Sequence, residues 1–184
     1  MFTPSLNNKK SMKAYYSIFD RRYLFKISFI VFLIFFSVLK SQRSITVAGG
    51  NWAVPIPTIT EAGSNYTGTY ESSDNQISLT ASVPLALSSG KVSVHYEPNP
   101  TWNSNLILNV KRTGDGSTIC VLCTISGGTA YQAVTLADLE LFRITAVLAL
   151  GSYSNIPIKI QLSGVSVTIP AATYNNKIVF TIGP

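Results

Sequence analysis

Apolar and polar residues alternate along several stretches of this chain, most regularly near its C-terminal end. Three segments there carry large apolar residues at every second position: Ile156, Ile158, Ile160 and Leu162; Val165, Val167 and Ile169; and Ile178, Phe180 and Ile182. A period of two places alternate side chains on one face of a β-strand. Because Gly164 and Pro170 interrupt the pattern, it predicts a β-meander whose apolar face must be covered by sheet from upstream.

Segments upstream show the same alternation with less regularity. Residues 44–50, 76–83 and 91–97 each predict a strand, whereas the prolines within residues 52–57 suit an edge strand or an extended lead-in. Residues 58–75 are polar and predict a loop with one irregular strand. Residues 106–110 and 118–125 predict a hairpin through the turn at residues 114–117. Residues 135–150 fit either a capped helix or a strand, and the neighbouring strands favour the strand.

These predictions together indicate an all-β domain. Seven to nine short strands, separated by Gly, Pro and Asn turns and without a sustained helical pattern, are typical of an antiparallel β-sandwich. We therefore expect a sandwich of immunoglobulin-like or jelly-roll type.

The N-terminal region has the composition of a secretory signal peptide. Six basic residues precede an apolar run, residues 27–39, and polar residues follow it. The run is shorter than the roughly 20 residues that span hydrocarbon, so we expect cleavage rather than anchoring. We predict a signal peptide and leader over residues 1–43 and a single domain over residues 44–184. Met12 is a more ordinary start than Met1, a hypothesis that a precursor peptide containing Ser5 would exclude.

The positive charge of the chain belongs to this leader. Residues 1–43 hold eight basic residues and one acid, a net charge of +7, whereas the rest holds six basic and seven acidic residues, a net charge of −1. Without a basic patch the domain is not expected to bind nucleic acid. We predict a secreted protein of the periplasm or cell surface, with membrane contact only through the leader if the leader stays uncleaved.

Cys120 and Cys123 are the most chemically suggestive pair. They lie in an apolar run that predicts a strand, where residues three apart point to opposite faces, so a bond between them would need a bulge. An oxidising compartment favours bridging. A local structural disulfide, two unpaired thiols and a redox or metal role all remain open, in that order of preference.

Acid–base chemistry has few candidates. His95 is the single histidine, and it shares the outward face of its strand with Lys91, Ser93 and Glu97, which favours a solvated side chain. Asp138 and Glu140 would share a strand face, and solvation is again the ordinary interpretation. We therefore predict no catalytic residues, no cofactor and no metal site, and expect a protein that is not an enzyme.

Aromatic residues offer a different kind of site. Trp and Tyr side chains exposed on a secreted β-sandwich can stack on sugar rings, and several stand in or beside predicted turns. The candidates for ligand stacking are Trp52, Trp102, Tyr66 and Tyr70. Packing into the core or at strand ends is the alternative for each of them.

The last residues resemble the closing strand of bacterial surface subunits of the spore-coat-protein-U and fimbrial type. The resemblance rests on residues 169–174, Ile-Pro-Ala-Ala-Thr-Tyr, followed by the alternating residues 178–182, and Ala172 stands where a glycine is usual in that family. It implies assembly by donor-strand exchange, in which an extended N-terminal strand completes the sheet of a neighbour. Residues 44–47 and 52–59 are the segments that could take this part.

These observations favour a secreted, non-catalytic surface protein with a structural or adhesive role, like a pilus or coat subunit. Its expected partners are copies of itself, another surface protein or a polysaccharide. A carbohydrate-binding module is the alternative, and an extracytoplasmic hydrolase comes third.

Overall fold

In a computed structural model of the protein, the described residues are 26, 29, 42–66, 68–84, 88–147 and 151–184. Gln42–Pro184 forms one compact unit. Most of the predicted signal peptide and leader, including the alternative start at Met12, lies outside the described residues. Within the residues that are described, no helix has the length and apolar character needed to cross a membrane.

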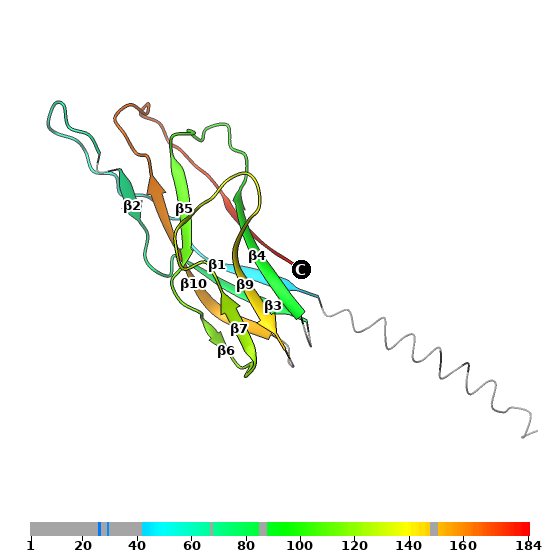
Figure 1. Ribbon diagram of the computed structural model, residues 1–184. Coiled ribbons are helices and arrows are strands. Elements are labelled where there is room, and N and C mark those ends of the chain that lie inside the picture. Colours follow the sequence, from blue (N-terminus) through cyan, green and yellow to red (C-terminus); the bar gives the residue numbers. More distant parts are fainter. Residues whose placement is uncertain (1–25, 27–28, 30–41, 67, 85–87, 148–150) are drawn as a thin grey trace, which may run out of the picture. The chain divides into compact units, whose positions relative to one another are not determined.

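The unit consists of two antiparallel sheets, which confirms the all-β prediction (Figure 1). The first sheet has the order β1-β3-β10-β5-β8, and β2 and β6 also pair with β10. The second has the order β11-β4-β9-β7. The first sheet comprises β1 (Ser44–Gly49), β2 (Thr69–Glu71), β3 (Ile77–Val83), β5 (Ile107–Arg112), β6 (Ser117–Thr118), β8 (Gln132–Ala133) and β10 (Gly151–Ser163). The second comprises β4 (Ser88–Tyr96), β7 (Cys123–Ser126), β9 (Leu139–Ala146) and β11 (Ile178–Gly183).

Alternation buries one face of each long strand. In β3, β4 and β10 the predicted apolar positions are the buried ones, for example Leu79, Val92 and Ile158, each fully buried. One feature of β10 was not predicted: the inward set changes from odd to even positions between Tyr153 and Ile156, where the pairing with β3 slips. Asn155 has a positive φ of 56° at this bulge, which lets one strand keep both halves of its apolar set inside.

The predicted C-terminal meander is wrong. β10 belongs to the first sheet and β11 to the second, so the chain crosses between the layers instead of forming a hairpin. Residues 165–169 form a turn in place of the middle strand, with Val165 buried and Val167 exposed. Gly164 begins this crossing with a positive φ of 81°, and a side chain there would overlap the backbone carbonyl of Asn105.

The predicted hairpin over residues 106–125 is also wrong. β5 pairs with β10 and β8, β6 pairs with a different part of β10, and β7 pairs with β9 in the other sheet. Alternation fixes the face that a strand buries but not its neighbour, and the long β10 offers a pairing edge to both β5 and β6. The strand preferred for residues 135–150 is confirmed by β9, although residues 148–150 lie outside the description.

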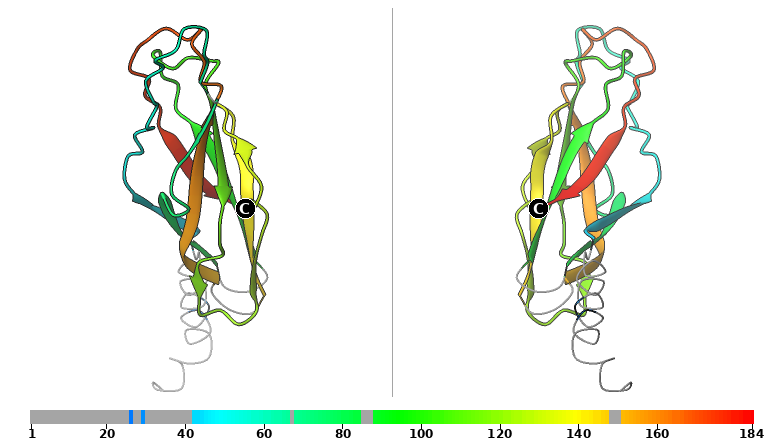
Figure 2. Two further views of the ribbon diagram at one scale, coloured as in Figure 1. Left: turned by 90° about the vertical axis from the view of Figure 1, so that its left-hand side faces the viewer. Right: turned by 90° about the vertical axis from the view of Figure 1, so that its right-hand side faces the viewer.

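The described strands number eleven, rather than seven to nine, because β2, β6 and β8 are only two or three residues long. Connections gather at the two ends of the sandwich (Figure 2). At one end, which we call the loop end, hydrogen bonds join residues 97–105 to residues 164–177. The β6–β7 turn lies at the opposite end, which we call the turn end.

Candidate functional site

A groove of about 970 Å³ opens toward the loop end of the sandwich. Its floor is the edge of the apolar core, formed by residues of β5 and β10 and by the chain just before β5. Its walls are two irregular segments, residues 50–56 and 165–177. The buried floor residues are Leu106, Leu108, Ile160 and Leu162.

Four half-buried aromatic side chains line this groove: Trp52, Tyr66, Trp102 and Tyr174. Asparagine side chains hold the turns that carry two of them. The Asn65 carboxamide oxygen accepts hydrogen bonds from the backbone N–H groups of Tyr66, at 2.8 Å, and Val167, at 3.1 Å. These bonds tie the two loops together beside the groove.

Trp102 closes a turn of its own, in which its N–H donates to the carbonyl of Asn99 at 3.0 Å. The Asn99 side chain accepts two hydrogen bonds from Thr101 and donates to the Asn175 carbonyl at 2.8 Å. The hydroxyl of Tyr174 donates to the Pro170 carbonyl at 2.6 Å. The rings are therefore mounted on turns with fixed backbone geometry.

The lining of the groove is almost neutral. Among the described residues it contains no carboxylate, imidazole or thiol, and Lys177, its one charged residue, pairs with Glu97 at 2.7 Å. Asn51, Asn175 and Asn176 contribute side-chain amides to the lining. Apolar surface with a few amide donors and acceptors suits the binding of an uncharged or extended ligand.

Three of the four predicted stacking residues meet in this groove. Tyr70, on β2, is not among the residues that line the groove. Tyr174 was missed as a stacking candidate, and its place in a proline-initiated turn is the signal that could have identified it. The gathering itself could not be read from the sequence, since the residues come from separate loops.

The fold and the groove define a class: a two-sheet, all-β domain with a nearly neutral, aromatic-lined groove. Comparisons with protein-family models, with curated proteins and with solved structures found no match to this chain.

His95 and Asp138 are the one pair of predicted acid–base candidates that the fold brings together. Nδ1 of His95 lies 2.7 Å from the Asp138 carboxylate, just before β9 begins. Glu140 pairs instead with Arg143. His95 is partly buried and Asp138 exposed, so the imidazole is less solvated than we expected. Among the described residues, Asp138 is the one side chain that forms a hydrogen bond with this histidine.

Cys120 and Cys123 form a disulfide with a Cα–Cα distance of 5.5 Å. The bulge expected for this bond is absent because the two cysteines do not share a strand. Residues 119–122 form the turn between β6 and β7, and a turn can direct both sulfur atoms to the same side.

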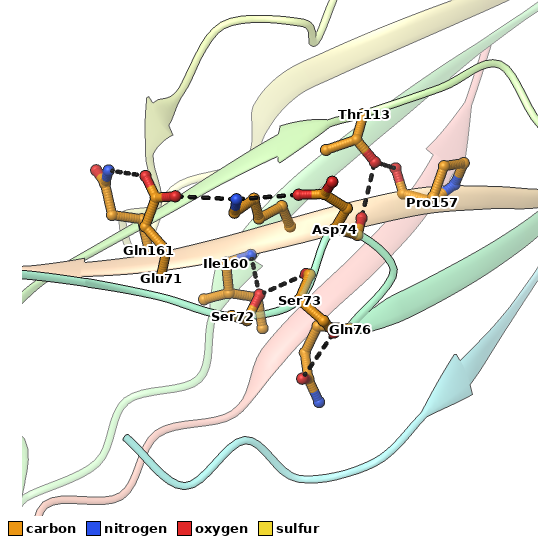
Figure 3. A network of polar contacts seen from close by, with 10 residues as sticks. Glu71, Ser72, Ser73, Asp74, Gln76, Thr113, Pro157, Ile160 and Gln161 are labelled. Atoms are coloured by element: carbon orange, nitrogen blue, oxygen red, sulfur yellow. Dashed lines mark hydrogen bonds and ion pairs between the residues drawn. The ribbon is translucent and has the colours of Figure 1, made fainter. Parts of the chain in front are cut away.

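A polar network on the outer face of the first sheet fastens β2 and the following turn to β10 (Figure 3). Lys159 lies 2.9 Å from the carboxylates of both Glu71 and Asp74. Next to these ion pairs, the Ser72 N–H donates to the Ile160 carbonyl and the Ile160 N–H donates to the Ser72 hydroxyl. That hydroxyl in turn donates to the Ser73 carbonyl. The network thus fastens the chain that follows the groove-lining residue Tyr66 to β10, and its chemistry is that of a structural clamp.

The clamp should weaken in acid. Hydrogen bonding from Lys159 lowers the pKa of Glu71 from 4.5 to about 2. The unfolded carboxyl takes up its proton near pH 4.5 and the folded one only near 2, so the stability that Glu71 contributes is complete above 4.5 and disappears as the pH falls to 2. We expect wild type to exceed Glu71→Gln in Tm at neutral pH, with the difference shrinking across that interval.

Thermal unfolding from pH 2 to 7 measures this difference directly. Glu61→Gln is the matched control, because Glu61 is exposed and forms no ion pair among the described residues. It should leave Tm unchanged at every pH. A Glu71→Gln difference that is the same at pH 2 and pH 7 would contradict the assignment.

Proposed function

We propose that this protein is a secreted, non-catalytic component of a bacterial cell surface, with a structural or adhesive role comparable to that of a pilus or coat subunit. Its two sheets would form a sandwich of immunoglobulin-like or jelly-roll type. A disulfide supports an oxidising compartment, and a neutral groove without acid–base groups supports binding rather than catalysis.

The observation that carries this proposal is the way residues 50–56 form one wall of the groove. Trp52 and Val54 point inward and pack against the core, while Ala53 between them is exposed. Among the described residues this segment alternates like a strand but pairs with no neighbouring strand. Its single backbone hydrogen bond is local, from the Ile56 N–H to the Val54 carbonyl. Such a segment covers apolar surface of the core but is held there by few backbone hydrogen bonds.

Among the described residues, two strand edges in this region have no ladder partner. β1 ends the first sheet and β11 ends the second, and Val47 on β1 is about half exposed. An extended segment from another copy could displace residues 50–56 and add to these edges, because unpaired strand edges accept further strands. This gives self-assembly a physical route that agrees with the C-terminal resemblance to surface subunits.

The test is the assembly state of native protein from cell-surface and culture-medium fractions, run on a denaturing gel with and without boiling. We expect a heat-labile ladder of multimers. Val54→Asp should abolish the ladder because the carboxylate would have to enter the apolar groove. Ala53→Asp is the matched control and should preserve it. A single monomer band in both lanes from wild-type cells would refute assembly by this route.

A polysaccharide ligand is the second candidate, favoured by the meeting of Trp52, Tyr66 and Trp102 in one groove beside amide groups. Stacking on the rings and hydrogen bonds to the amides would together recognise a neutral sugar chain. Loss of binding in Trp102→Ala would support this candidate, and a blank glycan panel would remove it.

A further inference from the structure

Four exposed aliphatic side chains stand at the turn end of the sandwich, away from the groove. We call them the aliphatic tip: Ile119, Val121, Leu122 and Val147. Ile119 is 97% exposed and Val121 93% exposed, the two highest values among the exposed large hydrophobic residues. Val147 belongs to the same surface because β7 and β9 pair Cys123 with Ala146, which places Leu122 and Val147 opposite each other.

The disulfide keeps these side chains in solvent. Cys120 is buried, and Cys123 packs against the core, so the ring that they close has its sulfur side inward. The Cys120 N–H also donates to the Thr118 hydroxyl at 3.1 Å. Val121 and Leu122, the two residues inside the ring, are thereby directed outward and cannot collapse onto the domain. Exposed aliphatic side chains gathered on one turn and on the facing strand end indicate an interaction site.

Charge is almost absent around the tip. No charged residue occurs between Gly116 and Ala137 or between Ile144 and Ile158. Two charged residues lie within two residues of β1 and β6 at this end: Arg43, whose Nε donates to the Ser89 carbonyl at 2.8 Å, and Asp115, which pairs with Arg112. Aliphatic segments without a charged side chain of their own match the apolar interior of a bilayer.

The chain also enters the domain at this end. β1 begins at Ser44, which pairs with Ser82, one residue before the end of β3. The apolar run of residues 27–39 stops five peptide steps earlier. Five extended residues span at most about 18 Å. A membrane that holds the run in the precursor is therefore within reach of this end of the domain.

We propose that the aliphatic tip inserts into the interfacial layer of a lipid bilayer and seats the domain on the membrane. A bilayer fits the surface better than a protein does. Four aliphatic side chains on a convex turn fall short of the roughly 800 Å² per partner of a stable protein interface. Insertion into lipid needs no complementary shape, and it buries each side chain from water.

The experiment places a fluorescent probe at each end of the domain. Val121→Trp puts an indole on the tip, and Val167→Trp puts one at an exposed valine of the loop end. The full chain is added to phosphatidylcholine vesicles containing phosphatidylglycerol, with or without bromine on the acyl chains, and the emission of Trp52 and Trp102 is subtracted with the parent protein. Both variants must retain the parental Tm, and Ile119→Trp serves as a second tip probe.

We expect brominated lipid to quench the tip probe, with a blue-shifted emission maximum, and to leave the loop-end probe unchanged. A tip probe that emits as in water and is not quenched would overturn the proposal. So would a blue shift that occurs without vesicles and disappears on dilution, because a second copy of the chain would then cover the tip. With the leader removed, Val121→Asp should lower the affinity of the domain for these vesicles at least about tenfold. Val167→Asp should leave that affinity unchanged.

Discussion

Replacing Arg112 with alanine is expected to lower the free energy of unfolding by about 3–5 kcal/mol. The Arg112 side chain is 4% exposed at the end of β5. Its guanidinium donates to the Gly127 carbonyl from two nitrogens, at 3.1 and 2.9 Å, and to the Gly114 carbonyl at 3.0 Å. It also pairs with the exposed Asp115. The alanine variant would lose all of these bonds and leave carbonyl groups without donors.

The neighbouring residue provides the control. Lys111 is on the outer face, with its ammonium group 4.4 Å from the centre of the Tyr131 ring, and Lys111→Ala should cost about 1 kcal/mol or less. Arg112→Lys should fall between the two, because lysine keeps the charge but lacks the planar fork of donors. Urea unfolding followed by circular dichroism measures all three. Equal losses of stability for Arg112→Ala and Lys111→Ala would show that the buried guanidinium does not fasten the end of β5 to the turns at Gly114 and Gly127.

Replacing Phe142 with alanine is expected to destabilise the domain by about 3–5 kcal/mol, because the ring would leave a cavity between the sheets. Phe142 is 1% exposed and is the largest of the fully buried side chains among the described residues. A loss of this size corresponds to a fall in Tm of roughly 10–20 °C. Differential scanning calorimetry gives the shift.

Leu139 on the same strand is the matched comparison, since it is 36% exposed. Leu139→Ala should lower Tm by only a few degrees. If both variants unfold at the same temperature, the apolar layer around Phe142 is not the main source of stability, and the inward face assigned to β9 would need revision.

The two proposals concern opposite ends of one domain. With the aliphatic tip seated on lipid, the loop end and its groove would face away from the membrane, where a second subunit or a polysaccharide can reach them (Figure 2). The two tests are independent, because Val54→Asp alters the groove and Val121→Trp probes the tip. A domain that fails one test can therefore still pass the other.

The groove shows what sequence reasoning could and could not recover of a site. Each aromatic residue was visible beside turn residues, so Trp52, Tyr66 and Trp102 could be named as candidates. Their meeting depends on Asn65 and Asn99, whose side chains join loops 102 and 76 residues apart in the chain. No local pattern reports a bond of that range, and for the same reason Tyr70 was grouped with residues that it does not accompany.

The sequence by itself determined that residues of β3, β4 and the second half of β10 form strands and which of their side chains face the core. That information is local, because a period of two depends only on the pleat of one strand. Tertiary structure decided which strands pair, where β10 is bulged and how the chain crosses from β10 to β11. These outcomes depend on contacts between distant segments that compete for the same strand edges, and on buried groups such as Arg112 whose hydrogen-bond partners exist only once the sheets have packed.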